Sequence, residues 1–470
     1  MHDSLAPRSS RLRSLGTPGA LACLLAACSG GDIRTGANAG EGGTTAGHVT
    51  PAAGSGGQTQ PSAGKSAAGS SAAGAGADAG RGGVAAAAGT GGKAGSAGKA
   101  GGAAGTAGAG GTAAPSGTLS NPAPGSKFFV GANFWNIDWE GSGDYFASNV
   151  DWSTTQNPWK PELISDLAPY AVLRFMDWNQ INEANNPQAD WNTRKKKTDM
   201  QNEPVAFEWQ IDLCNRAKKD YWVNIPSQAN ADYFTKLAQL IHDQLDPSLR
   251  VYVEWSNEVW NGGFPQRKYA AAQAKTLNLA GSDGAASYQV YESVRAFEAF
   301  EAVFGKGSPR LVKVIAGQAA STGPCDSEVA AFKDATINPN GTKADAYAIA
   351  PYFRGDSIDA LKNTGVPEAT GWVSDSAKCA KGAGWLLIAY EGGQDSYKNG
   401  DDRACTTLQN DAAMHDIYGT FLDSMVGAKL TGPFTQYTHS GACWGLKQKT
   451  SDTLANSPKY KGVIDWLATH

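Results

Sequence analysis

No phenylalanine, tyrosine or tryptophan occurs before Phe128 in this chain of 470 residues. Residues 29–120 are mainly Gly, Ala, Ser and Thr, with almost no large aliphatic side chain. Such a segment has no apolar surface whose burial could offset the backbone entropy lost on folding. We therefore expect residues 28–120 to form a disordered linker and residues 121–470 to form the single folded domain.

The chain also lacks a strong excess of charge. It has 40 Lys and Arg against 44 Asp and Glu, a formal net charge of −4 and a predicted pI of about 5.9. This balance gives no electrostatic attraction to nucleic acid or to acidic lipid. We expect no nucleic-acid partner, and we expect the protein to be a monomer.

A metal-binding pattern is missing as well. The six His are scattered along the chain, and the seven Cys form no CxxC pair. Zinc sites in proteins usually combine such pairs with a nearby His or Cys pair. We expect no metal and no other cofactor.

The N-terminus has no apolar run long enough to cross a bilayer. Three Arg precede an apolar run over residues 20–27, which is well short of the ~20 residues that a membrane span needs. The segment resembles a bacterial lipoprotein signal, because residues 25–28 read Leu-Ala-Ala-Cys. The resemblance implies that residues 1–27 are removed and Cys28 is lipidated; an ordinary secretory signal is the alternative. In both cases the protein is exported, with an outer-membrane or cell-surface location, or release outside the cell, and with membrane contact only through the lipid.

Export permits disulfide bonds. Five cysteines fall in the expected folded domain, so at least one must be unpaired. Cys214 lies in an apolar helical pattern and is expected to be the free, buried thiol. We expect the pairs Cys325–Cys379 and Cys405–Cys443.

Strand-like and helix-like stretches alternate from residue 127 onward, and several strands are apolar on both faces, as in a sheet covered by helices. The expected folded domain, residues 121–470, is somewhat longer than the ~250 residues typical of a (β/α)₈ barrel. We therefore predict an α/β fold, a (β/α)₈ TIM barrel. The eight expected strands are 128–135, 171–178, 221–226, 251–256, 311–318, 344–353, 385–391 and 432–445.

Two of these strands end on a glutamate. The strand at residues 251–256 is followed by Asn257-Glu258, and the strand at 385–391 ends on Glu391 before two glycines. In a TIM barrel the active site is built at the C-terminal ends of the strands. Hydrolysis of a glycosidic bond needs one carboxylic acid to protonate the leaving oxygen and one carboxylate to attack the anomeric carbon. An exposed acid at a strand end is the alternative for each residue.

Residues 126–470 resemble a retaining glycoside hydrolase of clan A, whose catalytic glutamates follow the fourth and seventh barrel strands. The resemblance implies that Glu258 is the general acid/base and Glu391 the nucleophile. It also implies that Asn257 donates a hydrogen bond to the sugar 2-hydroxyl. Arg174 would support the nucleophile, and Tyr352, at the end of the sixth strand, would donate a hydrogen bond to it.

Two departures from the clan pattern concern the family and hence the substrate. Val259 follows the Asn-Glu pair where many members have Pro, and Ala350 stands where His is common.

Trp444, after the eighth strand, would form the floor of the sugar site. Further candidates for sugar contacts are Trp135, Trp178 and Trp260, which could stack on rings or pack as ordinary loop residues, and Asn133 and His439.

Two other charged features have structural explanations. Glu254 is expected to point into the barrel and to form an ion pair with Arg174 or Lys313. The basic run over residues 194–197 is expected to be a solvated loop.

These patterns predict a glycoside hydrolase that cleaves β-linked poly- or oligosaccharides by a retaining double displacement. Glu258 would be protonated and Glu391 ionised, with their carboxyl groups about 5 to 5.5 Å apart. The alternatives are a non-catalytic glycan-binding lipoprotein on the same barrel and a glycosidase that removes α-linked substituents such as arabinofuranose.

Overall fold

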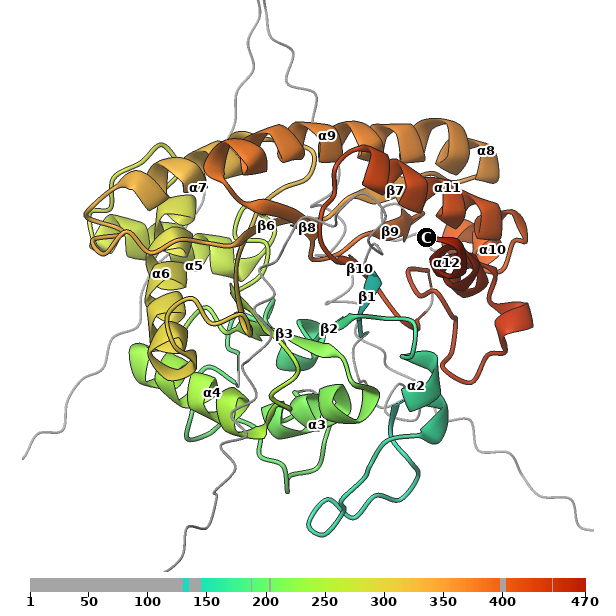
Figure 1. Cartoon of the computed structure of the whole chain (residues 1–470), viewed down its shortest axis with the longest axis horizontal. Helices are drawn as coiled ribbons and strands as arrows, with labels where there is room; N and C mark the ends of the chain where they lie inside the picture. The colour runs from blue at the N-terminus through green and yellow to red at the C-terminus, as the bar shows by residue number, and fades with distance from the viewer. Residues whose placement is uncertain (1–129, 135–144, 187, 203, 398–402, 442) are drawn as a thin grey trace, which may run out of the picture. The chain divides into compact units, whose positions relative to one another are not determined.

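The computed structural model describes residues 130–134, 145–186, 188–202, 204–397, 403–441 and 443–470 (Figure 1). The expected signal, the linker, Cys28 and Trp135 lie outside these described residues.

Eight parallel strands close into a barrel in the order β1-β10-β8-β6-β5-β4-β3-β2. Each expected strand contributes, so the predicted (β/α)₈ barrel is confirmed. The barrel strands are β1 (Val130–Asn133), β2 (Val172–Arg174), β3 (Asp220–Ile225), β4 (Val251–Trp255), β5 (Leu311–Ala316), β6 (Ala346–Ile349), β8 (Leu386–Ala389) and β10 (Phe434–Gln436).

Helices surround the barrel (Figure 1). Some helix starts follow local signals. The side chain of Asn230 accepts a hydrogen bond from the Tyr233 N–H at the start of the helix over 231–244, and Asp283 caps the helix over 284–304 in the same way. The main helices are α2 (Pro161–Asp166), α3 (Phe207–Ala217), α4 (Ala231–Gln244), α5 (Pro265–Thr276), α6 (Gly284–Phe304), α7 (Gly323–Lys333), α9 (Val366–Ala383), α10 (Arg403–Leu408), α11 (Ala413–Gly427) and α12 (Pro458–Thr469). Shorter helical turns are η1 (Asp177–Asn179), α8 (Ile358–Ala360), η2 (Leu361–Gly365) and η3 (Leu454–Asn456).

The predicted sixth strand, 344–353, is in fact two strands. After β6 the chain passes Pro351, which has no N–H to donate to a sheet ladder. Tyr352 then begins β7 (Tyr352–Arg354), which pairs with β9 (Gly393–Asp395) in a separate two-stranded parallel sheet. Tyr352 therefore does not end a barrel strand, and a second sheet holds it beside the segment that follows β8.

Side chains fill the inside of the barrel. Trp222 on β3 stacks on Tyr252 of β4, with ring centroids 5.3 Å apart and planes 15° apart. Val312, Ile388 and Tyr390 belong to the same buried cluster. The barrel is therefore a packed core, and ligands must bind at its ends.

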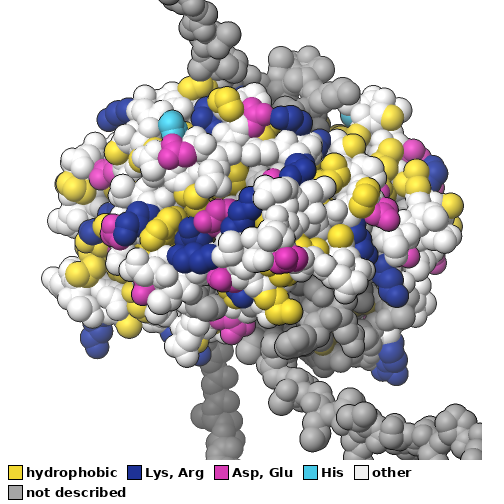
Figure 2. Space-filling model, turned by 90° about the horizontal axis from the view of Figure 1, so that it is seen from below, with side chains coloured by type: hydrophobic (Ala, Val, Ile, Leu, Met, Phe, Trp, Pro, Cys, Tyr) yellow, Lys and Arg dark blue, Asp and Glu magenta, His cyan; other side chains and the backbone are white. Residues whose placement is uncertain are grey.

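The cysteine predictions are confirmed. Cys325–Cys379 joins α7 to α9, Cys405–Cys443 joins α10 to the segment after β10, and Cys214 is buried and free. No helix in the described part of the chain is long and apolar enough to cross a membrane. Lys and Arg side chains interleave with Asp and Glu on the face shown in Figure 2, which agrees with the small net charge.

Candidate active site

Glu258 and Glu391 lie at the same end of the barrel. They follow β4 and β8, the fourth and seventh barrel strands in chain order, and parallel strands in one barrel all end on the same face. Both residues are nearly buried, with 7% and 4% of their surface exposed. The negative charge of Glu391 helps to raise the pKa of Glu258, so the two carboxyl groups interact electrostatically.

Arg174, the last residue of β2, links the site together. Its Nη1 donates to Glu391 Oε1 at 2.8 Å and to Asn133 Oδ1 at 3.1 Å. Its Nη2 donates to Asn257 Oδ1 at 2.8 Å, and both Nε and Nη2 donate to Glu254 Oε2 at 3.1 Å. One fully buried guanidinium thus bridges two carboxylates, and this pairing offsets the cost of burying the charges.

Two donors stabilise the ionised form of Glu391. Arg174 binds one carboxylate oxygen, and the Tyr352 hydroxyl donates to the other at 2.9 Å. Burial raises the pKa of Glu391, while the charge of Arg174 and the Tyr352 hydrogen bond oppose this rise. The cation beside the carboxylate suits it to act as a nucleophile rather than an acid.

The turn after Glu391 requires glycine. Gly392 and Gly393 have φ values of 153° and 118°, which side chains rarely adopt. A Cβ on Gly392 would lie 2.6 Å from the Phe434 ring, and one on Gly393 would lie 2.5 Å from the Gln436 amide. The two glycines let the chain leave β8 sharply while Glu391 stays at the strand end.

Glu258 has neutral donors in place of a cation. The Tyr390 hydroxyl donates to its Oε1 at 2.9 Å, and Asn261 Nδ2 donates to its Oε2 at 2.8 Å. Burial, followed by the charge of Glu391, raises the pKa of Glu258 to about 7. A carboxyl group with this pKa is partly protonated at neutral pH, as a general acid must be.

The backbone around Glu258 is strained. Ser256 and Glu258 have φ values of 63° and 42°, in the left-handed region that non-glycine residues seldom occupy. Such conformations cluster at functional sites, where surrounding structure maintains them. Here, Asn224 on β3 helps to maintain the conformation of Ser256, because its side-chain amide donates a hydrogen bond to the Ser256 carbonyl at 2.9 Å.

Tyr390 and Asn261 contact Glu258 but were missed by the sequence reasoning. Tyr390 directly precedes Glu391 and lies with Ile388 in the barrel interior. The period of two residues in a strand could have placed it there, since Ile388 and Tyr390 must face the same side. The contact of Asn261 depends on the strained turn, which sequence patterns do not reveal.

Asn133 is at the site, but its amide is engaged by protein groups. Its Nδ2 donates to the Tyr390 carbonyl at 2.9 Å, and its Oδ1 accepts from Arg174. With 1% of its surface exposed, Asn133 positions Arg174 and has little surface for the sugar contact that was predicted.

Trp178 and His439 do not lie where a sugar could reach them. Trp178 is fully buried and stacks on Trp159, with planes 6° apart. His439 is also fully buried, shares a hydrogen bond of 3.1 Å with the Tyr170 hydroxyl and packs against Tyr460. Burial lowers the pKa of His439 to about 3, so the ring is neutral. The predicted sugar contacts of both residues are wrong, because the segments after β2 and β10 fold back into the core.

Two predicted aromatic residues remain candidates for a sugar surface. Trp260 is half-buried, and its indole N–H donates to the Tyr390 hydroxyl at 3.3 Å. Trp444 has 8% of its surface exposed, packs against Tyr397 with ring centroids 5.4 Å apart, and follows the disulfide-bonded Cys443. Both therefore have fixed positions on segments that leave the C-terminal end of the barrel.

The expectation for Glu254 is confirmed with Arg174 as its partner, and the Trp222 indole N–H donates a further hydrogen bond to Glu254 at 2.8 Å. Lys313 instead pairs with Glu301 at 2.7 Å.

The basic run 194–197 is not a solvated loop. Arg194 is buried in an ion pair with Glu208 at 2.7 Å, and the Lys197 ammonium lies 4.4 Å from the centre of the Trp209 ring. These contacts fix the long segment between β2 and α3.

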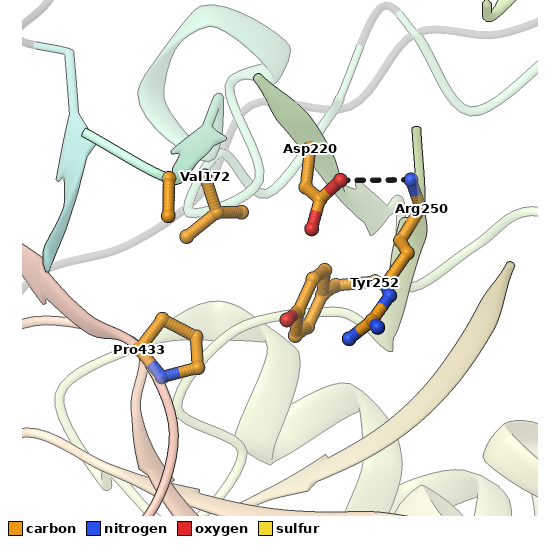
Figure 3. Close-up of a pocket in the computed structure, with 6 residues that line it drawn as sticks. Val172, Asp220, Arg250, Tyr252 and Pro433 are labelled. Atoms are coloured by element: carbon orange, nitrogen blue, oxygen red, sulfur yellow. Dashed lines mark hydrogen bonds between the residues drawn. The ribbon is translucent and has the colours of Figure 1, made fainter. Parts of the chain in front are cut away.

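The N-terminal end of the barrel has a different character. A cavity of about 240 Å³ lies there, lined by Ala171, Val172, Asp220, Arg250, Tyr252 and Pro433 (Figure 3). Asp220 accepts a hydrogen bond from the Arg250 backbone N–H at 2.8 Å, and burial raises its pKa to about 6. Asp220 is the one carboxylate among the six residues that line this cavity, so the cavity lacks a pair of acids like Glu258 and Glu391.

Within the described residues, no group of three or more His, Cys, Asp or Glu side chains could hold a metal ion. Separately, the unlike partners of Glu258 and Glu391 at the C-terminal end suit the two carboxyl groups to acid, base and nucleophile chemistry.

No protein-family model matches the chain, and no curated protein sequence matches it significantly. Solved structures with similar folds include an exo-β-1,4-mannosidase from Opitutaceae bacterium strain TAV5, with 11% identity and a TM-score of 0.42 over 73% of this chain and 60% of that one. This chain thus spans less than two thirds of the mannosidase. A xylanase from Cellvibrio japonicus has 10% identity and a TM-score of 0.42 over 73% and 70% of the two chains. A β-glucosidase from Thermotoga maritima has 14% identity and a TM-score of 0.39 over 73% and 98%. Likenesses at this level assign no activity to the chain.

Proposed function

We propose that this protein is a glycoside hydrolase that cleaves β-linked poly- or oligosaccharides with retention of configuration. The observation that carries the proposal is the pair of buried glutamates with different partners. Glu391 faces the cation of Arg174, whereas Glu258 has only neutral donors and the nearby negative charge of Glu391. Two carboxyl groups with unlike environments are what a division into acid and nucleophile requires.

In the first step, a Glu391 carboxylate oxygen attacks the anomeric carbon while Glu258 gives its proton to the leaving oxygen. The products are a covalent glycosyl ester on Glu391, an ionised Glu258 and the free leaving group. In the second step, Glu258 takes a proton from water as the water attacks the same carbon, and the ester bond breaks. This route implies a carboxyl separation of about 5 to 5.5 Å.

The substrate is proposed to be a polymer or oligomer because aromatic surfaces accompany the acids. Trp260 and Trp444 would stack on sugar rings, and Asn257 would bind the hydroxyl next to the anomeric carbon. Neither metal nor cofactor takes part in this chemistry.

The same proposal includes an extracytoplasmic tether. Residues 1–27 would be a lipoprotein signal, residues 28–120 a linker attached through Cys28, and residues 121–470 the catalytic domain of a monomer. The two disulfides in the folded part favour an oxidising compartment.

The test is a panel of β-linked polysaccharides assayed for new reducing ends, with wild type, Glu258→Gln and Glu391→Gln. Proton NMR of the first product should show the same anomer as the substrate. Turnover that survives the Glu391 change, or an inverted first product, would contradict the proposal. If the wild type turns over nothing while glycan binding survives both changes, the protein is a binding lipoprotein instead.

A further inference from the structure

Three side-chain amides form a network beside Glu258. Asn182, in the segment between β2 and α3, is half-buried, and its Oδ1 accepts from Asn257 Nδ2 at 3.1 Å and from Gln266 Nε2 at 2.7 Å. Gln266, in the first turn of α5, also donates to the Asn257 backbone carbonyl at 2.7 Å. The segment between β2 and α3 and the start of α5 thus meet at Asn257.

This network determines which way the Asn257 amide points. Arg174 can only donate, so it binds the Asn257 oxygen; Asn182 presents an oxygen, so it binds the Asn257 nitrogen. Partners of opposite kind on the two ends leave one orientation of the amide. Asn182 accepts one of the two hydrogens of this NH₂ group, and the remaining one can be donated to a substrate hydroxyl.

The position of that remaining hydrogen is defined by Arg174. The same guanidinium binds Glu391 through Nη1 and Asn257 through Nη2, so the attacking carboxylate and the amide lie side by side. A sugar whose anomeric carbon meets Glu391 would place its 2-hydroxyl near Asn257. Hydrogen bonds to this hydroxyl strengthen in the transition state of glycoside hydrolysis.

We propose that Asn182 is a positioning residue that aims the Asn257 amide at the substrate 2-hydroxyl and so makes the enzyme select sugars that carry this group. The inference rests on the proposed glycosidase function. Asn182 would thus determine specificity through Asn257, without touching the reacting atoms. It lies in the segment between β2 and α3, whereas the acids lie at the ends of β4 and β8.

The test compares an aryl β-glycoside with its 2-deoxy analogue, using the sugar that the polysaccharide panel identifies. Asn182→Ala should lower kcat/KM for the 2-hydroxy substrate about tenfold, the usual effect of losing one hydrogen bond, and change the value for the 2-deoxy substrate less than about twofold. Asn182→Asp keeps an acceptor oxygen for Asn257 and Gln266 and should restore most of the selectivity.

Gln228→Ala is the matched control. Gln228 Nε2 donates to the Ala184 carbonyl at 2.8 Å in the same segment, so its loss loosens the segment without touching Asn257. The selectivity ratio should stay at the wild-type value. Equal losses on both substrates in Asn182→Ala, or the same change of ratio in Gln228→Ala, would overturn the inference alone. A wild type without any glycoside turnover would overturn the proposed function together with it.

Discussion

At the C-terminal end of the barrel, hydrogen bonds join the buried side chains of Arg174, Glu254 and Glu391. At the N-terminal end, by contrast, Asp220 lines a cavity and accepts a hydrogen bond from a backbone N–H. Burying an ion costs several kcal/mol even after relaxation, and a fold that needed only stability would use apolar side chains. The difference fits the proposed function, in which the buried charges at the C-terminal end include the nucleophile Glu391.

The largest expected effect is a difference in activity between variants at the two ends of the barrel. Glu391→Gln removes the nucleophile and should lower kcat by at least about 10⁴-fold, as the loss of a central catalytic group does in other hydrolases. Asp220→Asn is the control at the other end, and its activity should stay within about twofold of wild type. Assays on the substrate found in the panel measure both. Comparable losses in the two variants would remove the distinction.

Arg174 should dominate stability at the C-terminal end. Arg174→Met leaves Glu254 and Glu391 buried without their cation and should lower the free energy of unfolding by about 3–5 kcal/mol. Arg216→Met removes an exposed pair with Asp212 on α3 and should cost less than about 1 kcal/mol. Urea unfolding of the two variants gives the comparison, and similar losses would show that burial of the network matters little.

Asp220 should destabilise the fold at high pH. Its pKa is about 6 in the folded protein, against an ordinary value of 3.8. Its favourable contribution to the free energy of unfolding is therefore complete below pH 3.8 and is lost as the pH rises through 6. Asp220→Asn avoids this loss and keeps an acceptor for the Arg250 N–H. It should add about 1–3 kcal/mol of stability near pH 8 and much less near pH 4. A gain that does not change with pH would contradict this explanation.

Tyr390 should affect the pH dependence of the proposed reaction. Activity should fall as the pH rises through the pKa of Glu258, about 7, because the first step needs the protonated acid. The Tyr390 hydrogen bond lowers this pKa, so Tyr390→Phe should move the alkaline limb of kcat/KM upward by roughly half to one unit. Tyr221→Phe, whose hydroxyl donates to Gln210, should leave the limb in place. A downward shift in Tyr390→Phe would contradict the role of its hydroxyl.

The smallest expected effect concerns the linker. A protein that lacks residues 1–120 should keep the activity and the unfolding midpoint of the full chain, because residues 29–120 have almost no large apolar side chain and residues 1–27 are the proposed signal. Activity assays and thermal unfolding measure both quantities. Loss of folding would show that the domain begins before residue 121.

The sequence was sufficient for the barrel and for the residues that end its strands. Apolar strands place Arg174, Asn257, Glu258 and Glu391 by their register alone, and their contacts follow from closure of the barrel. It was insufficient for side chains on the connecting segments. Trp178 and His439 follow strands in the sequence, yet their segments turn back into aromatic clusters that only tertiary packing defines.

The break at Pro351 illustrates the same limit. An apolar run from residue 344 to 353 has the composition of one strand, and the missing N–H of one proline divides it between two sheets. The Tyr352 contact with Glu391 was nevertheless predicted. One continuous strand and the observed pair β6 and β7 both place the tyrosine at the C-terminal end of the barrel.

The glycine pair after Glu391 restricts how new specificities can be engineered. Any side chain at position 392 or 393 would displace Phe434 or Gln436, which belong to a barrel strand, so libraries that vary this turn would consist mainly of misfolded proteins. Redesign for other glycans therefore has to act through side chains on the longer segments after β2 and β10, where Asn182 and Trp444 lie.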